Sequence, residues 1–122
     1  MCGRYVLGRV TDLSERFQLR QIPIPLDPTF NAAPSQNLPV IIIEPDGARR
    51  VVAMKWGLEP KWSRPDRGPS PAPINARAET LTERAMFRGL IAHHRCLVPA
   101  TGFYEWQQTA RGKQPFFVHP TD

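Results

Sequence analysis

The sequence predicts an α+β fold in which a curved, mostly antiparallel sheet or open β-barrel carries a few short helices. Two observations favour this class. Short apolar runs, each about the length of one strand, recur along the chain between residues typical of turns. Signals for a helix start occur at two places, and the 14 prolines restrict helices elsewhere. A chain of 122 residues is long enough for one domain with its own hydrophobic core.

Two short helices are expected. The first covers about 12–20, because Asp12 to Glu15 form a capping-box pattern and apolar residues follow one turn apart. The second opens with another such pattern at Thr80, and Gly89 is its expected end. Both are short elements beside a fold built mainly from strands.

Strands are expected in five runs. Apolar residues at 40–43 and 51–54 flank Asp46-Gly47, a pair typical of a tight hairpin turn. Three further strand-like runs cover residues 96–98, 102–106 and 116–118. The proline-rich segments 23–34 and 60–73 are predicted to be long, ordered loops.

Two of these runs are expected to be buried. Cys96 lies within the apolar sequence Arg95-Cys96-Leu97-Val98 and is interpreted as a core thiol. Phe116-Phe117-Val118 resembles a buried strand that pairs with a later stretch of chain. Since only four residues follow it, we expect the chain to lack its C-terminal part.

Composition indicates which partners and cofactors to expect. The net charge is +5, and 13 of the 16 basic residues are arginine, whose planar fork grips phosphate oxygens. A nucleic acid partner is consistent with this balance, although a solvated basic surface would explain it too. No run reaches the ~18 apolar residues of a membrane span, and no apolar segment typical of a secretory signal begins the chain. We expect no membrane partner, a cytoplasmic location and, in a bacterium, association with the nucleoid.

The two cysteines do not indicate a disulfide framework. His93, His94 and Cys96 are close in sequence, but no second pair of ligands occurs at a spacing typical of zinc sites. We therefore expect neither a metal ion nor any other cofactor.

Cys2 is the first candidate for chemistry. If Met1 is removed, Cys2 carries an α-amine and a thiol on adjacent carbons, and groups of both kinds have reactive forms near neutral pH. Such an aminothiol condenses with an aldehyde to an imine, which the thiol closes to a thiazolidine. By itself, however, a cysteine after the initiating methionine is common.

Two further motifs carry polar groups in suggestive surroundings. In Asn75-Ala76-Arg77-Ala78-Glu79, Asn75 can donate and accept hydrogen bonds and Arg77 can hold a phosphate. In Gly102-Phe103-Tyr104-Glu105-Trp106, alternation places Phe103 and Glu105 on one face and the other two aromatic residues on the opposite face. A carboxyl group among aromatic side chains suits proton transfer. A plain loop and a solvent-facing edge strand remain the alternatives.

Tryptophans occur near the second proline-rich loop. Trp56 ends a strand and is interpreted as a core residue. Trp62 lies within the loop beside Lys61 and Arg64, a composition typical of stacking on unpaired bases while cations hold phosphates. A loop tryptophan that packs against the core is the alternative.

Together these motifs resemble the SRAP family (SOS-response-associated peptidase). The series comprises Met1-Cys2-Gly3-Arg4, Asn31-Ala32-Ala33-Pro34, Trp56-Gly57-Leu58 with Pro60 and Trp62, 75–80, 95–100, 102–106 and 113–116. The match runs from residue 2 to about 118. It implies one SRAP-like domain over 1–122, lacking its C-terminal part, that shields abasic sites in single-stranded DNA by covalent DNA–protein crosslinking.

The resemblance also implies roles for single residues. The catalytic set would comprise Cys2 as the nucleophile, Asn75 orienting the terminus and the sugar, and Glu105 moving protons. The DNA-binding set would comprise Gly3, Arg4 and Arg77 beside the lesion, with Pro34 and Trp62 as wedge and stacking surface. Self-removal of Met1 by a peptidase activity, and an associated lyase activity, would accompany these roles.

Two departures from the family pattern affect these expectations. Family members place a catalytic histidine well after the Pro-Phe-Phe strand, so His93, His94 and His119 are not assigned that role. The family often has paired tryptophans in the loop, whereas Ser63 follows Trp62 here. Two other functions stay open: an N-terminal-nucleophile cysteine amidohydrolase or peptidase, and a non-catalytic module that binds single-stranded DNA.

Overall fold

A computed structural model describes residues 2–59 and 72–121. The elements in chain order are β1 (Arg4–Leu7), α1 (Leu13–Arg16), β2 (Leu19–Gln21), β3 (Thr29–Ala32), β4 (Asn37–Ile43), β5 (Arg49–Lys55), the 3₁₀ helix η2 (Ala78–Thr80), α2 (Ala85–Arg88), β6 (Gly102–Thr109) and β7 (Gly112–Val118). The predicted fold class is confirmed, with open sheets rather than a closed barrel. None of the helices in these two ranges is long and apolar enough to cross a membrane.

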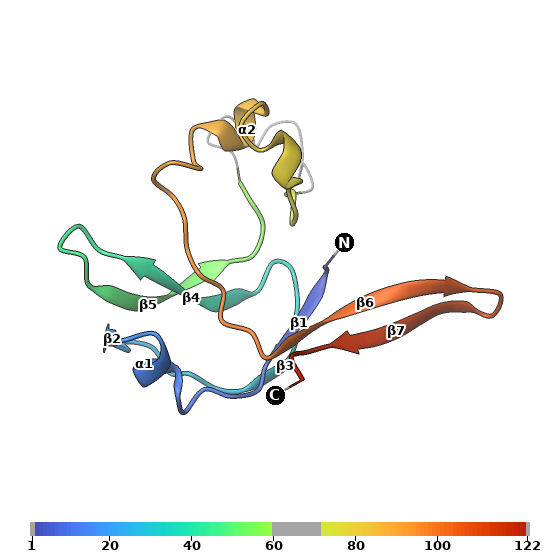
Figure 1. Ribbon diagram of the computed structural model, residues 1–122, viewed down its shortest axis with the longest axis horizontal. Helices are drawn as coiled ribbons and strands as arrows, with labels where there is room; N and C mark the ends of the chain where they lie inside the picture. Colours follow the sequence, from blue (N-terminus) through green and yellow to red (C-terminus); the bar gives the residue numbers. More distant parts are fainter. Residues whose placement is uncertain (1, 60–71, 122) are drawn as a thin grey trace.

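The strands form two sheets (Figure 1). One has the order β3-β1-β6-β7 and the other the order β2-β5-β4. All neighbouring strands are antiparallel except β2 and β5, which run parallel. In Figure 1 the β6–β7 hairpin projects away from the rest of the chain, while β1 lies at the centre of the molecule.

The core lies where β1 and β3 meet β4 and α1. Its buried cluster comprises Tyr5, Leu7, Leu13, Ala32 and Leu38, against which Val10, Phe17, Leu19, Leu26 and Trp56 pack. Leu7 is 1% exposed, and full burial of such a side chain stabilises a fold by about 1.5–3 kcal/mol. The packing therefore fixes β1, the strand that follows Cys2.

The predicted β4–β5 hairpin is confirmed and is longer than the apolar runs alone. Val40 pairs with Val52 and Ile41 with Val51, and the pairing extends to both strand ends. Gly47 in the turn has a φ of +81°, a left-handed conformation that glycine adopts without steric cost.

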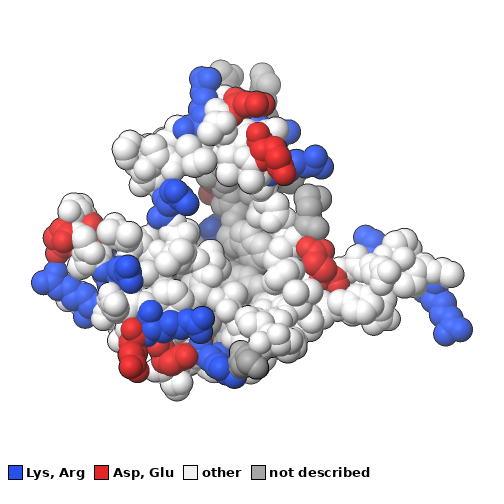
Figure 2. Space-filling view, in the orientation of Figure 1, with Lys and Arg blue, Asp and Glu red and all other residues white. Residues whose placement is uncertain are grey.

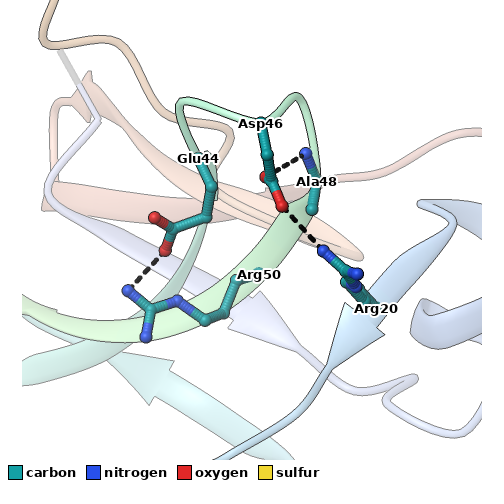
Figure 3. A network of polar contacts seen from close by, with 5 residues as sticks. All are labelled: Arg20, Glu44, Asp46, Ala48 and Arg50. Carbon is teal, nitrogen blue, oxygen red and sulfur yellow. Dashed lines mark hydrogen bonds and ion pairs between the residues drawn. The ribbon is translucent and has the colours of Figure 1, made fainter.

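One ion pair connects β2 with this hairpin, and a second lies within the hairpin (Figure 3). The Arg20 guanidinium lies 2.7 Å from the Asp46 carboxylate, which also accepts a hydrogen bond from the Ala48 N–H at 2.9 Å. Arg50 pairs with Glu44 across the base of the turn. Exposed pairs of this kind contribute about 0–1 kcal/mol each, so the buried apolar residues account for more of the stability.

Both predicted helices are shorter than expected. The first covers Leu13–Arg16, and the Asp12 side chain does not cap it. The second is divided into η2 and α2 by a turn, although Gly89 follows its last residue as predicted. Neither η2 nor α2 has a buried residue. Because short helices are marginal without tertiary packing, the capping pattern alone does not sustain a longer one.

Three expectations about strands and burial were wrong. The predicted loop over 23–34 contains β3, because pairing with β1 satisfies its backbone. The run 96–98 forms only one bridge, between Leu97 and Ile41, and Cys96 is exposed rather than a core thiol. A single bridge on a passing connection leaves the neighbouring side chains outside the core.

The third wrong expectation concerns β7. The residues 116–118 do form a strand, which pairs with the preceding β6, but every residue of β7 is exposed rather than buried. Pairing of β7 with a later stretch of chain stays a prediction. Pro115 fits this position at the edge of the sheet, because proline has no N–H for a further partner strand.

Candidate functional site

Three segments that are distant in sequence meet at the N-terminal end of β1. Cys2 and Gly3 lead into this strand, and its first residue, Arg4, pairs with Tyr104 of β6. Because the strands are antiparallel, Glu105 follows Tyr104 toward the end of β1 at which Gly3 precedes Arg4. The structure therefore brings the predicted Cys-Gly-Arg start and the predicted Glu105 to one end of the sheet.

The segment after β3 reaches the same end. Tyr5 pairs with Ala32 in antiparallel register, so the chain after Ala32 continues toward the N-terminus. Pro34 is half-buried in the turn that follows, where the Gln36 side chain accepts a hydrogen bond from the Ala33 N–H at 2.9 Å. Pro34 therefore lies toward the same end of β1 as Cys2.

A hydrogen bond joins Cys2 to the loop after the second proline-rich segment. The Asn75 side-chain amide donates to the Cys2 carbonyl at 2.8 Å, across 73 positions of sequence. The Cys2 thiol is half-buried and lies 3.5 Å from the Arg4 carbonyl, to which it can donate. Asn75 therefore restrains the backbone of Cys2, the predicted nucleophile.

The two predicted arginines border this contact. The Arg4 guanidinium donates to the Gly3 carbonyl at 2.7 Å, which holds it over the start of β1. Arg77 is exposed two residues after Asn75, with extended backbone immediately before η2. A cation at Arg4, with Arg77 two residues after Asn75, favours an anionic ligand on this side of Cys2. Figure 2 shows cationic side chains around the hollowed middle of the molecule as well as on its left edge.

Glu105 is half-buried on β6. On the opposite face, the rings of Tyr104 and Trp106 lie 6.4 Å apart, which confirms the predicted alternation. Glu105 itself pairs with Phe116 of β7. A carboxyl group in this partly apolar setting can exchange protons with a reacting group at the end of β1.

Other predicted residues do not join the site. Trp62, together with Lys61 and Arg64, lies outside the described residues. The exposed Cys96 follows α2 and lies beyond the contacts around Cys2. Although the residue as a whole is exposed, neighbouring atoms partly desolvate the Cys96 thiol and raise its pKa, which keeps the thiol protonated at neutral pH. Over 2–59 and 72–121, no group of three or more histidine, cysteine or acidic side chains is arranged to hold a metal ion.

Burial also acts on Tyr5, beside the site. Desolvation raises the pKa of the Tyr5 hydroxyl above its ordinary value of 10.0, so this group is neutral in the folded chain. The neutral Tyr5 hydroxyl therefore contributes to the free energy of unfolding at any pH below its ordinary pKa. This contribution is lost as the pH rises from the ordinary pKa through the raised pKa of the folded chain.

A hollow of about 200 Å³ among Leu7, Arg9, Thr101 and Phe117 lies at the opposite end of β1 from Cys2. None of the described residues predicted for the site lines it. At the Cys2 end, Asn75 and Arg77 are exposed, so this part of the candidate site is accessible to an extended ligand.

One residue of the site was missed as a functional candidate. Trp56 was interpreted only as a core residue, and it does pack against the core. In addition, its indole N–H donates to the Ile74 carbonyl at 2.9 Å, next to Asn75. The signal in the sequence was a tryptophan directly before a glycine at the end of a strand, but its bonding partner depends on the fold.

Comparisons with known proteins agree with this arrangement. The family model described as "SOS response associated peptidase (SRAP)" matches residues 1–122. The abasic site processing protein YoqW of Bacillus subtilis is 40% identical over 112 residues, which cover 88% of this chain and 49% of YoqW. HMCES of Gallus gallus is 37% identical over an alignment of 142 positions, which covers 98% of this chain and 42% of HMCES. The chain thus spans about half the length of the curated relatives it matches.

Solved structures resemble the fold as well. A phage-related protein from Bordetella bronchiseptica superposes with a TM-score of 0.77 at 28% identity, covering 97% of this chain and 55% of that protein. A protein from Bacteroides thetaiotaomicron gives a TM-score of 0.79 at 26% identity, covering 99% and 55%. Because the family model matches residues 1–122 of this chain, the chain belongs to the SRAP family.

Proposed function

We propose that this chain captures abasic sites in single-stranded DNA by forming a covalent DNA–protein crosslink through Cys2, and so shields the lesion in the DNA damage response. The observation that carries this proposal is the 2.8 Å hydrogen bond from Asn75 to the Cys2 carbonyl, beside Arg4 and the Glu105 end of β6. It holds the backbone of a residue that can present an amine and a thiol together. Relatives named abasic site processing proteins support an action on abasic sites.

The reaction uses the ring-opened form of the abasic deoxyribose, which exposes an aldehyde. The Cys2 amine adds to the aldehyde carbon to give a carbinolamine, and loss of water gives an imine. The thiol sulfur then bonds to the imine carbon, while the thiol proton passes to the nitrogen. The product is a five-membered thiazolidine, and one water molecule is released overall.

Each nearby group has a task in this sequence. Glu105 donates a proton to the departing carbinolamine hydroxyl, and its carboxylate afterwards accepts one from the amine or thiol. Asn75 keeps the Cys2 backbone in position. Arg4 and Arg77 hold the phosphates that flank the lesion, because their guanidinium groups form charged hydrogen bonds with phosphate oxygens.

Single-stranded DNA would lie against the exposed Asn75 and Arg77. Among the residues that the structure describes, Gly3 leaves room beside the start of β1, because no heavy atom of theirs lies within 4 Å of where its Cβ would be. Pro34 acts as a wedge against the bases next to the lesion, and Trp62 provides a stacking surface. Binding before the reaction is electrostatic, in keeping with a net charge of +5.

Removal of Met1 precedes this chemistry, since a thiazolidine needs the free amine of Cys2. Self-removal corresponds to hydrolysis of the Met1–Cys2 peptide bond and accounts for the peptidase named in the family description. The imine intermediate also activates the sugar for strand cleavage by β-elimination, which is the associated lyase activity.

Denaturing gel electrophoresis tests the proposal directly. The chain is incubated with a single-stranded oligonucleotide that carries one abasic site, after mass spectrometry has verified that Met1 is absent. A band that survives denaturation is expected, and Cys2→Ala should abolish it while reversible binding persists. A non-catalytic DNA-binding module would give no such band, and an amidohydrolase would instead hydrolyse simple amides.

A chain that retains Met1 supplies the matched control. It has the same side chains but no free amine on Cys2, so no stable crosslink is expected. Crosslinking at the normal rate by a Met1-retaining sample would contradict the thiazolidine mechanism. The salt dependence of reversible binding gives a second measurement, with an expected slope of about −0.7 per phosphate neutralised.

A further inference from the structure

We propose that Trp56 is a positioning residue for Cys2: its indole N–H fixes the segment that carries Asn75, and Asn75 in turn holds Cys2. This inference rests on the proposed function, since it assigns a further residue to the same site. It concerns a contact between two segments that sequence alone does not bring together.

Trp56 is held in place through both its backbone and its ring. The backbone N–H of Trp56 donates to the Gln36 carbonyl at 3.0 Å, and the backbone carbonyl of Trp56 accepts from the Ser35 N–H at 2.9 Å. These bonds tie it to the turn that follows β3. The ring centroid lies 5.7 Å from that of Tyr5, which is itself 6% exposed in the core. A side chain anchored this way presents its N–H in one direction.

The indole N–H of Trp56 contacts the segment 72–77, which has no regular secondary structure and is largely exposed. The indole donates to the Ile74 carbonyl at 2.9 Å, and the Leu58 N–H donates to the Pro73 carbonyl at 3.1 Å. Between the two donors, Gly57 has a φ of +130°, and a Cβ there would lie 3.3 Å from the Ala72 side chain. The absence of that Cβ allows the two segments to run side by side.

Two hydrogen bonds therefore connect the core to Cys2 in series. The first joins Trp56 to Ile74, and the second joins Asn75, the next residue, to the Cys2 carbonyl at 2.8 Å. Loss of the first bond leaves the Asn75 segment with fewer constraints and so widens the range of positions open to Cys2. Since reaction rates depend steeply on the alignment of reacting atoms, the expected effect falls on the rate rather than on DNA affinity.

Trp56→Phe tests this directly, because it keeps an aromatic ring against Tyr5 and removes the N–H. In single-turnover crosslinking at saturating abasic oligonucleotide, we expect the maximal rate to fall roughly tenfold. Affinity for an oligonucleotide with a tetrahydrofuran abasic analogue, which has no aldehyde, should change less than about twofold. Equal rates for the variant and the unaltered chain would overturn the inference.

A closer replacement separates the hydrogen bond from packing. Incorporation of benzothienylalanine at position 56 exchanges only the indole N–H for sulfur and keeps the bicyclic shape. The same loss of rate is expected, together with an unchanged melting temperature. Tyr5→Phe serves as the matched control, because it keeps the ring that Trp56 contacts and removes a hydroxyl with no hydrogen-bond partner among the described residues. Its rate should equal that of the unaltered chain.

Hydrogen exchange of the Asn75 side-chain amide, followed by NMR without DNA, gives a readout that is independent of reactivity. Exchange should accelerate in both Trp56 variants and not in Tyr5→Phe. If the unaltered chain forms no crosslink but this pattern appears, the proposed function fails while the positioning role of Trp56 stands. If Asn75 exchange is the same in every variant, the positioning role is wrong even where crosslinking occurs.

Discussion

The two long hairpins of this chain share local geometry and differ in their surroundings. β4–β5 and β6–β7 are both continuous antiparallel pairs with glycine in the left-handed region at or beside the turn: Gly47 has a φ of +81° and Gly112 a φ of +113°. Yet β4–β5 buries Leu38, Val40, Ile41 and Val51, whereas every residue of β7 is exposed. Hairpin formation is thus local, and burial depends on which distant segments cover the strand.

The functional consequences differ accordingly. β4–β5 supports the core and leads directly into Trp56, which donates a hydrogen bond to the segment that carries Asn75. β6 is buried only at its first residue, Gly102, where it joins β1, and it carries Glu105 close to that junction. The far end of the β6–β7 hairpin projects from the molecule. Its surface is largely uncharged, and basic side chains lie toward its tip (Figure 2). One hairpin supports the segment that holds Cys2, and the other carries Glu105, the proposed proton donor.

The largest expected effect on stability is at Ile41→Ala. Ile41 is 2% exposed, pairs with Val51 and exchanges two backbone hydrogen bonds with Leu97. Its truncation should lower the free energy of unfolding by about 2–5 kcal/mol, because it removes buried apolar contacts and leaves a cavity. Urea denaturation followed by circular dichroism measures this. A loss below about 1 kcal/mol would mean that β4–β5 is no better packed than β6–β7.

Glu105→Gln should affect the reaction instead. The amide keeps the size of the side chain but cannot transfer a proton, so single-turnover crosslinking should slow by about 10²-fold. Binding of a tetrahydrofuran abasic oligonucleotide should hardly change. The variant is best compared in this chain and in a chain of the length of its relatives. A rate equal to that of the unaltered protein in both would make Glu105 a structural residue.

Gly102→Ala examines the junction between the hairpin and β1. A Cβ at position 102 would lie 2.5 Å from the Phe117 ring and 2.6 Å from the Val118 carbonyl oxygen. Since the carbonyl belongs to the backbone of β7, the hairpin itself must shift, and we expect a loss of about 1–3 kcal/mol. Gly89→Ala is the control, because its Cβ would meet nothing within 4 Å. Equal melting temperatures for the two variants would show that the junction adapts freely.

The smallest effect is expected at Val118, when the same substitution is made there and at Val51 of the other hairpin. Val51→Thr introduces a hydroxyl at a side chain that is 1% exposed, and should cost about 1–3 kcal/mol. Val118→Thr makes the same change where the side chain is 43% exposed, and should stay within about 0.5 kcal/mol. Thermal unfolding of both variants measures the difference. Similar losses at the two positions would indicate that β7 is covered in solution.

Much of the fold could be predicted from local patterns. Asp46-Gly47 between apolar runs specifies a hairpin, because turn geometry and strand propensity act over a few residues. Alternation along 102–106 correctly separated Glu105 from Tyr104 and Trp106. The helices were overestimated because a capping pattern gives a start, whereas helix length depends on burying one face. The exposure of Cys96 and β7 could not be foreseen, because apolar character does not say what lies against a strand.

For the site, the sequence by itself determined the chemical groups: an aminothiol precursor at Cys2, an amide at Asn75, a carboxyl at Glu105 and cations at Arg4 and Arg77. Only the tertiary structure decided that Asn75 holds Cys2, that Glu105 lies at the same end of β1, and that Trp56 ties the Asn75 segment to the core. The physical reason is that side-chain chemistry is a property of each residue. Hydrogen bonds across 73 positions depend instead on strand register and core packing, which arise from the chain as a whole.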